Sequence, residues 1–277
     1  MIASLFIFVS CEKDITVDLP AGKAQVVIEA YVEPGLPPYA YLSRSAGYFD
    51  PIDSAALSAL LIKDAVVLIS DGVSTDTMKA VAPELGYLYM ALNMVGVTER
   101  RYTITVTTKE GEKVEAYATL PKPVVLDSVY FKVYGNLDSL GFAYGYLRDP
   151  DTAGNAYRWF AKRPSKDDVF LTPFGSVFED KFINGTGIEF GFSRPTLPNS
   201  VEPDTGIERG FYKRGDTIIV KFCTIDADAF NFWRSAETQS GNNGNPFSSV
   251  AFIKSNVKGG LGFFTGYGAS YDTIYAK

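Results

Sequence analysis

Residues 226–270 have the sequence DADAFNFWRSAETQSGNNGNPFSSVAFIKSNVKGGLGFFTGYGAS, and this segment guides the interpretation of the whole chain. It begins with a predicted helix near 226–238, because Asp226 can cap a first turn and Ala229, Trp233 and Ala236 recur on one face. The glycines, asparagines and proline at 241–246 predict the end of that helix, since glycine and asparagine tolerate positive φ and proline lacks a donor.

Glycines and aromatic residues then alternate along 259–268. Glycine lets one backbone pack closely against another, and aromatic side chains can cover such a junction. We therefore predict a structural corner that closes a β-domain, formed by Trp233, Gly259, Gly260, Gly262 and Phe263. The alternative for this segment is a ligand-binding loop. Beside the corner, Phe247 and Phe264 are the candidate contacts with a partner or ligand.

Composition favours β-structure outside this segment. The chain has 277 residues, of which 14% are aromatic, including 17 Tyr and 20 Phe. Such residues suit pleated, half-buried surfaces. We expect an all-β protein with an N-terminal immunoglobulin-like or transthyretin-like sandwich, followed by a second β-rich domain that carries one helix.

Charge and missing residue types exclude several classes of function. The net charge of −6 argues against a nucleic-acid partner, which requires a basic surface. No histidine is present, so Ser-His and Cys-His nucleophile pairs and the commonest zinc ligand are excluded. Cys11 and Cys223 are the only thiols and cannot form a cysteine-rich metal site. We expect no cofactor and no catalytic residues.

Strand and turn signals divide the chain into two domains. The segment 101–107 alternates strictly between polar and apolar residues, and similar strands recur at the spacing of a sandwich of seven or so strands over 23–120. Leu120–Pro121–Lys122–Pro123 is a stiff linker, because paired prolines hold an extended conformation. The second domain is predicted over 124–277, with strands that include 156–162 and 216–224.

Several motifs together resemble a known family. They are Phe232–Trp233, Asn245–Pro246–Phe247, the glycine-rich run from Asn256 to Phe264, Cys-Glu-Lys-Asp at 11–14 and SAGYFDP at 45–51. The three tail motifs, in their order along the chain, resemble the Bacteroidota outer-membrane lipoproteins grouped as domain of unknown function 4249, and the two N-terminal motifs extend the resemblance. The resemblance extends over nearly the whole chain. It implies association with a TonB-dependent transporter in a nutrient-uptake or surface complex.

The N-terminal residues are predicted to carry a lipid anchor. Residues 1–11, MIASLFIFVSC, fit a signal peptide whose apolar core is too short to span a bilayer and which ends at Cys11. A cysteine after such a run resembles a lipobox, in which the thiol is acylated; a buried N-terminal strand is the alternative. Glu12, Lys13 and Asp14 look like a signal for export to the cell surface, and 12–22 would form a tether.

Two further motifs carry candidate sites. Asp149, Asp151 and Asn155 alternate like the ligands of a calcium loop but lack its later glutamate, and Asp-Pro-Asp is also common hairpin chemistry. Asp-Ser/Thr-apolar tripeptides resemble the O-glycosylation pattern of Bacteroidota envelope proteins, with Thr77 and Ser139 as candidate acceptors; otherwise they simply lead from a turn into a strand.

These observations lead to one expected function and two alternatives. We expect a non-enzymatic lipoprotein, attached through Cys11 to the outer membrane and facing the cell surface, that acts as an accessory or binding component of a TonB-dependent transporter. The alternatives are a surface adhesin or structural lipoprotein, and a carbohydrate-active enzyme. The enzyme would need a pair of carboxylates converging in a cleft, and the sequence alone selects no such pair.

Overall fold

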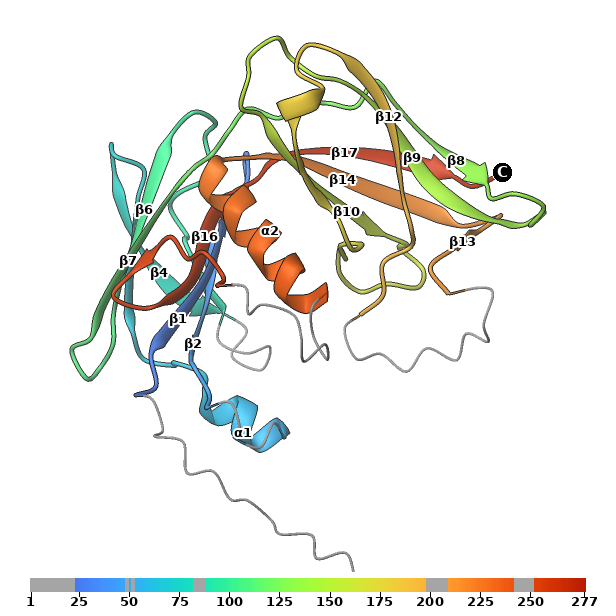
Figure 1. Ribbon diagram of the computed structural model, residues 1–277. Helices are drawn as coiled ribbons and strands as arrows, with labels where there is room; N and C mark the ends of the chain where they lie inside the picture. Colours follow the sequence, from blue (N-terminus) through green and yellow to red (C-terminus); the bar gives the residue numbers. More distant parts are fainter. Residues whose placement is uncertain (1–22, 48–49, 51–52, 82–87, 198–208, 242–251) are drawn as a thin grey trace, which may run out of the picture.

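The computed structural model of the chain describes residues 23–47, 50, 53–81, 88–197, 209–241 and 252–277 (Figure 1). Strands account for most of the regular structure. Within these residues the α-helices are α1 (Ser54–Ala59) and α2 (Ala227–Gly241), with a short 3-10 helix at Asp180–Phe182. The prediction of an all-β protein is confirmed.

The first domain is built on one nine-stranded sheet that folds around its own core. Its strands run in the order β15-β7-β6-β3-β4-β5-β2-β1-β16. Alternation of side chains explains the folding of β6, in which the apolar Tyr102, Ile104 and Val106 are buried and the threonines between them are not. The bounds are β1 Val26–Val32, β2 Tyr39–Arg44, β3 Val66–Ser70, β4 Thr75–Val81, β5 Leu88–Met90, β6 Arg101–Thr107, β7 Lys113–Thr119, β15 Val257–Lys258 and β16 Leu261–Gly266.

The second domain packs two smaller sheets around an aromatic core. One has the order β11-β10-β14-β17; the other has the order β12-β9-β13, with β8 also paired to β9. Trp159, Tyr157 and Phe222 are completely buried between them. The bounds are β8 Ser128–Val133, β9 Leu140–Arg148, β10 Ala156–Lys162, β11 Val177–Glu179, β12 Gly187–Phe192, β13 Tyr212–Lys213, β14 Thr217–Ile225 and β17 Gly268–Tyr275.

The tail does not belong wholly to the second domain, so the predicted domain division is wrong there. Strands β15 and β16 lie at the two ends of the strand order of the first domain, and only two glycines separate them in the chain. β16 pairs in parallel with β1, with Ala30 opposite Phe264, whereas β17 pairs with β14 of the second domain. The prediction failed because local sequence patterns do not report pairing between the two ends of a chain.

Helix α2 lies between the first and the second domain (Figure 1). Asp226 caps it, because the Asp226 carboxylate accepts a hydrogen bond from the amide of Ala229 at 2.9 Å. The other carboxylate oxygen accepts from the amide of Thr119, at the end of β7, at 3.1 Å. One aspartate therefore starts the helix and ties it to the end of β7, next to the linker between the domains.

Candidate ligand-binding site at the domain junction

The glycines of the tail let β16 approach β1 and β7 closely. Gly262 has φ +103°, and a Cβ atom there would overlap the carbonyl oxygen of Ile28. Gly259 has φ +83°, and a Cβ at Gly260 would lie 2.5 Å from the carbonyl oxygen of Val26. Residues with a side chain rarely adopt these φ values, so the turn and the parallel pairing both depend on glycine.

The side chains of Phe263 and Phe264, which follow Gly262 in β16, point in opposite directions. Phe264 is 1% exposed and belongs to the core of the first domain, so the expectation that it contacts a partner is wrong. Phe263 faces the other way and packs against α2, with ring centroids 4.3 Å from Phe232 and 4.6 Å from Trp233. Successive strand residues point to opposite faces, which explains the difference. Phe247 lies outside the described residues.

A buried ion pair joins the two domains beside this corner. The ammonium of Lys221, on β14, donates to the carboxylate of Glu33, which follows β1. The second oxygen of that carboxylate accepts from the hydroxyl of Tyr271 at 3.0 Å. Glu33 is 5% exposed and Lys221 7%, so each charge has given up most of its hydration for this contact.

A second buried cation lies next to the pair. The guanidinium of Arg158 is 3.3 Å from the centroid of Trp233 and 4.7 Å from that of Phe160, and it donates to the hydroxyl of Tyr267 at 2.6 Å. Cation–π contacts of this kind strengthen when the cation is desolvated. The tyrosine also stacks on Tyr31 of the first domain, 5.6 Å between centroids. Aromatic and charged contacts therefore fix how the domains meet.

A cavity of about 430 Å³ opens at this junction. We call it the junction pocket. Its first wall is the outer face of β1 and β2, which contributes Glu29, Tyr31, Tyr39 and Tyr41. Its second wall comes from β10, β14 and the loop after β10, with Tyr267 between the walls; it contributes Phe160, Lys162, Asp168, Val169, Phe170 and Lys221. Small-molecule sites commonly have this size, lie between domains and have aromatic walls.

The polar groups of the junction pocket carry both signs of charge. Lys162 donates to the carbonyl oxygen of Asp168 at 2.7 Å, and Glu29 accepts from the hydroxyl of Tyr31 at 2.5 Å. Burial raises the pKa of Tyr39 and of Tyr41 above the ordinary tyrosine value, with nearby carboxylates adding to the effect. Both hydroxyls therefore stay neutral at physiological pH. Neither has a hydrogen-bond partner among the residues that the structure describes.

The chain was compared with protein families and with curated proteins. A family model described as Domain of unknown function (DUF4249) matches residues 12–272. The chain belongs to this family. The match covers both domains and the tail that joins them, and confirms the resemblance found in the sequence motifs. The comparison with curated proteins found no match.

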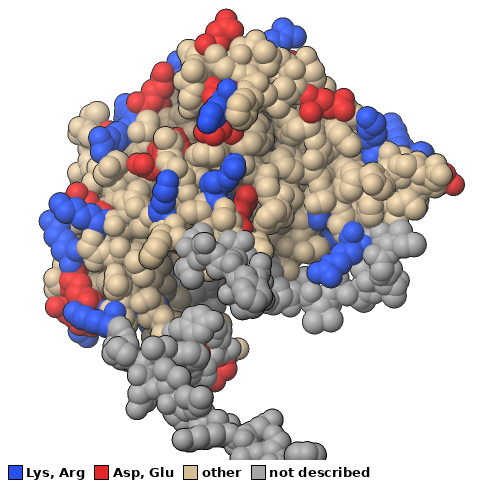
Figure 2. All heavy atoms as spheres, in the orientation of Figure 1, with Lys and Arg blue, Asp and Glu red and all other residues tan. Residues whose placement is uncertain are grey.

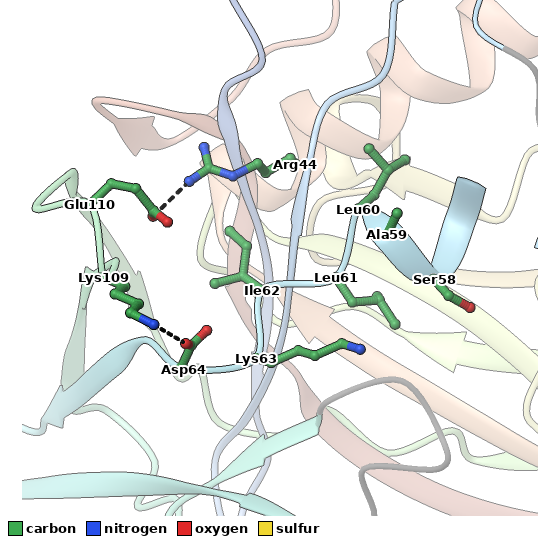
Figure 3. Close-up of a pocket in the computed structure, with 10 residues that line it drawn as sticks. All are labelled: Arg44, Ser58, Ala59, Leu60, Leu61, Ile62, Lys63, Asp64, Lys109 and Glu110. Carbon is green, nitrogen blue, oxygen red and sulfur yellow. Dashed lines mark hydrogen bonds and ion pairs between the residues drawn. The ribbon is translucent and has the colours of Figure 1, made fainter. Parts of the chain in front are cut away.

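This DUF4249 chain has another hollow, of about 280 Å³, between β2, the end of α1 and the turn before β7 (Figure 3). Four of its five charged side chains are paired with one another: Arg44 with Glu110 at 2.9 Å, and Lys109 with Asp64 at 3.6 Å. None of the 10 lining residues is aromatic. The junction pocket is therefore the better candidate for a binding site.

The candidate calcium ligands are not brought together as a site. Asp149 is 3% exposed, and its carboxylate already accepts from the hydroxyl of Tyr157 at 2.5 Å and the amide of Gly185 at 3.2 Å. Asp151 is exposed, and the side chain of Asn155 donates to the carbonyl oxygen of Thr152. Across the described residues, no group of three or more acidic or cysteine side chains could hold a metal ion.

The remaining predicted residues do not belong to the described lining of the junction pocket. Thr77, on β4, and Ser139, before β9, are both exposed. Cys11, the sorting residues Glu12, Lys13 and Asp14, and the tether up to residue 22 are outside the described part of the chain, whereas Cys223 is buried and reduced. Over the residues that can be placed, neither helix is long and apolar enough to cross a membrane.

The pocket tyrosines were missed by the sequence interpretation, although a signal for them exists. In β1, the buried Ile28, Ala30 and Val32 fix the inner face, so Tyr31 must point outward. In β2, the same argument from the buried Ala40 and Leu42 places Tyr39 and Tyr41 on the outer face. Aromatic residues on the face of two paired strands that points away from the core indicate that this second face is also covered, by another part of the protein or by a ligand.

Proposed function

We propose that this protein is a non-enzymatic, lipid-anchored binding component of the outer membrane, which captures a small ligand in the junction pocket for a TonB-dependent transporter. The pocket is the observation that carries the binding role. It combines a volume of about 430 Å³ with aromatic walls from both domains and a few polar groups. Such a combination is typical of small-molecule sites.

The membrane attachment is supported by the sequence around Cys11. The family match begins at residue 12, immediately after that cysteine, as expected if the family describes a mature lipoprotein. One acyl chain gives only marginal membrane binding, and stable anchoring takes more than one, as a lipoprotein's several chains provide. The transporter as partner is supported by the resemblance of the sequence motifs to outer-membrane lipoproteins.

A carbohydrate-active enzyme is the second candidate, because two carboxylates, Glu29 and Asp168, line the junction pocket. Glycoside hydrolysis needs one of its two acids to be held protonated, as burial in an apolar site achieves. Glu29 and Asp168 are both exposed. Binding without hydrolysis therefore fits the pocket better. On the face in Figure 2, positive and negative side chains are interspersed, so that face shows no large surface of a single sign.

The proposal is tested on the native protein in its own membranes. Cys11→Ala should move the protein from the membrane fraction to the soluble fraction after a carbonate wash; retention in the membrane would contradict the anchor. Affinity purification of the detergent-extracted wild-type protein should bring down an outer-membrane receptor of the TonB-dependent class. Recovery of the protein alone, or with other surface proteins only, would favour an adhesin or structural role.

Hydrolysis is tested separately with Glu29→Gln, which keeps the size of the side chain and removes its charge. If the protein is a binding component, wild type and variant both leave any bound saccharide intact over long incubation. Cleavage by wild type that stops in the variant would establish the enzyme instead.

A further inference from the structure

We infer that the junction pocket binds an uncharged saccharide, which stacks on the outward-facing tyrosines of β2 and makes hydrogen bonds to the charged side chains around them. This inference rests on the proposed binding role and adds the chemical class of the ligand. Three features of the pocket carry it: the arrangement of the aromatic faces, the balance of charge, and the free hydroxyls.

The neighbouring rings of Tyr31, Tyr39 and Tyr41 are inclined to one another and do not form two parallel walls. Tyr31 and Tyr39 have ring centroids 5.1 Å apart and are tilted by 33°, and Tyr39 and Tyr41 are 6.1 Å apart and nearly perpendicular. A flat aromatic ligand needs two parallel faces to enclose it, which neighbouring rings at 85° do not offer. A sugar ring presents an apolar face of C–H groups with hydroxyls around its edge, and successive rings of a short chain can meet faces of different orientation.

The charged side chains of the pocket are of both signs. Two acidic residues, Glu29 and Asp168, and two basic residues, Lys162 and Lys221, line it. Lys221 is already paired with Glu33, and Lys162 with the Asp168 backbone. Glu29, Asp168 and Lys162 form no ion pair with other described residues, so unpaired charges of both signs line the pocket. A ligand of one sign would meet like charge as well as opposite charge, and like-charge contacts are costly. Hydroxyl groups both donate and accept, so they can use carboxylates and ammonium groups together.

The tyrosine hydroxyls complete the match. Those of Tyr39 and Tyr41 are neutral and have no partner in the described residues, so each can donate one hydrogen bond and accept others. A wholly apolar ligand would bury them unsatisfied, at a cost that a polyhydroxylated ligand avoids. Faces for stacking and free donors therefore occur on the same two side chains.

The test uses the full-length lipidated protein, extracted in mild detergent and applied to an array of neutral, acidic and amino oligosaccharides. We expect retention of neutral saccharides, with an affinity that does not change between low and high salt, because a neutral ligand makes no screened charge pair. The affinity for the best neutral saccharide is then measured by calorimetry for variants. Retention of acidic or amino saccharides alone would overturn the inference.

Tyr41→Ala is the decisive variant, because Tyr41 is 37% exposed and its loss leaves the core intact. It should weaken binding about tenfold or more, as truncation of an aromatic contact residue commonly does, without a change in melting temperature. Tyr117→Ala is the matched control: Tyr117 is 44% exposed on β7, away from the pocket, and its variant should bind like wild type. Wild-type affinity in Tyr41→Ala would overturn the site.

The inferred ligand class can be wrong even where the proposed binding function is right. Mass spectrometry of small molecules that copurify with the native protein distinguishes the two. A non-saccharide ligand that is lost from Tyr41→Ala would overturn the saccharide and keep the binding role. If no small molecule copurifies, no saccharide is retained and no receptor is recovered, both the inference and the proposed function are wrong.

Discussion

The buried pair of Glu33 and Lys221 gives the sharpest test of how the two domains are joined. The pair lies across the junction, and the carboxylate also accepts the Tyr271 hydroxyl. In Glu33→Ala the ammonium would be left among Phe160, Phe170 and Tyr267, whose rings surround it at 5.2–5.9 Å from their centroids. The aromatic faces attract a cation but cannot replace a carboxylate.

The expected loss is that of leaving a buried charge without its partner. Removing one partner of a buried ion pair typically costs about 3–5 kcal/mol. The free energy of unfolding of Glu33→Ala should therefore fall by about 3–5 kcal/mol.

Urea unfolding of Glu33→Ala, Lys221→Met and the double variant provides the measurement. The double variant should lose less than Glu33→Ala alone, because it buries no unpaired charge. Glu99→Ala is the control, since Glu99 and Lys122 form a pair at 3.0 Å whose side chains are 64% and 68% exposed, and such a pair contributes about 0–1 kcal/mol. A Glu33→Ala protein as stable as the control, or additive losses in the double variant, would refute the reasoning.

Three further outcomes are expected. Phe263→Ala should cost about 3–5 kcal/mol, because it empties the space between β16 and α2, and a wild-type midpoint in urea would contradict the corner. Gly262→Ala should prevent folding or cost more than about 3 kcal/mol, whereas Gly35→Ala, with φ +74° and nothing within 4 Å of the new Cβ, should cost only about 1 kcal/mol; equal losses would argue against the close approach. Hydrogen bonds from the backbone of Ser74 and its turn lower the pKa of Asp71 to about 2, so its stabilisation is complete above pH 4 and disappears as the pH falls toward 2. Asp71→Asn should therefore lower the free energy of unfolding by about 1–2 kcal/mol at pH 7 and make it depend less on pH between pH 4 and pH 2. An unchanged pH dependence between these values would contradict the prediction.

Local patterns predicted the strands well where the apolar pattern is regular. The segments 101–107 and 156–162 match β6 and β10 to the residue, because buried and exposed side chains alternate along the first and nearly every side chain is buried in the second. Strand β4 was not predicted. In Thr75–Val81, only Asp76 and Met78 are buried, and a buried aspartate breaks the apolar pattern that would have revealed the strand.

The candidate site could not be predicted from local sequence patterns. Its walls come from residues 29–41, 160–170 and 221, with Tyr267 from the tail, and only the folded chain brings them together. The sequence did identify the tail as a corner of glycines and aromatic residues. It could not show that the corner joins two domains, because a parallel pair between β1 and β16 leaves no mark in either segment alone.

The tail makes the two domains a single structural unit. Without β15 and β16, β7 and β1 would each expose an unpaired edge, and the first core would lack Phe264. Without β17, β14 would become an edge strand paired only with β10 in the second domain. The linker at 120–123 is therefore a junction and not a point at which the chain divides into independent parts. The same tail places Tyr267 between the pocket walls. The pocket therefore forms only when both domains and the tail have folded, and the packing of the folded domains then keeps its walls in place. A site built in this way pays little ordering entropy when a ligand enters.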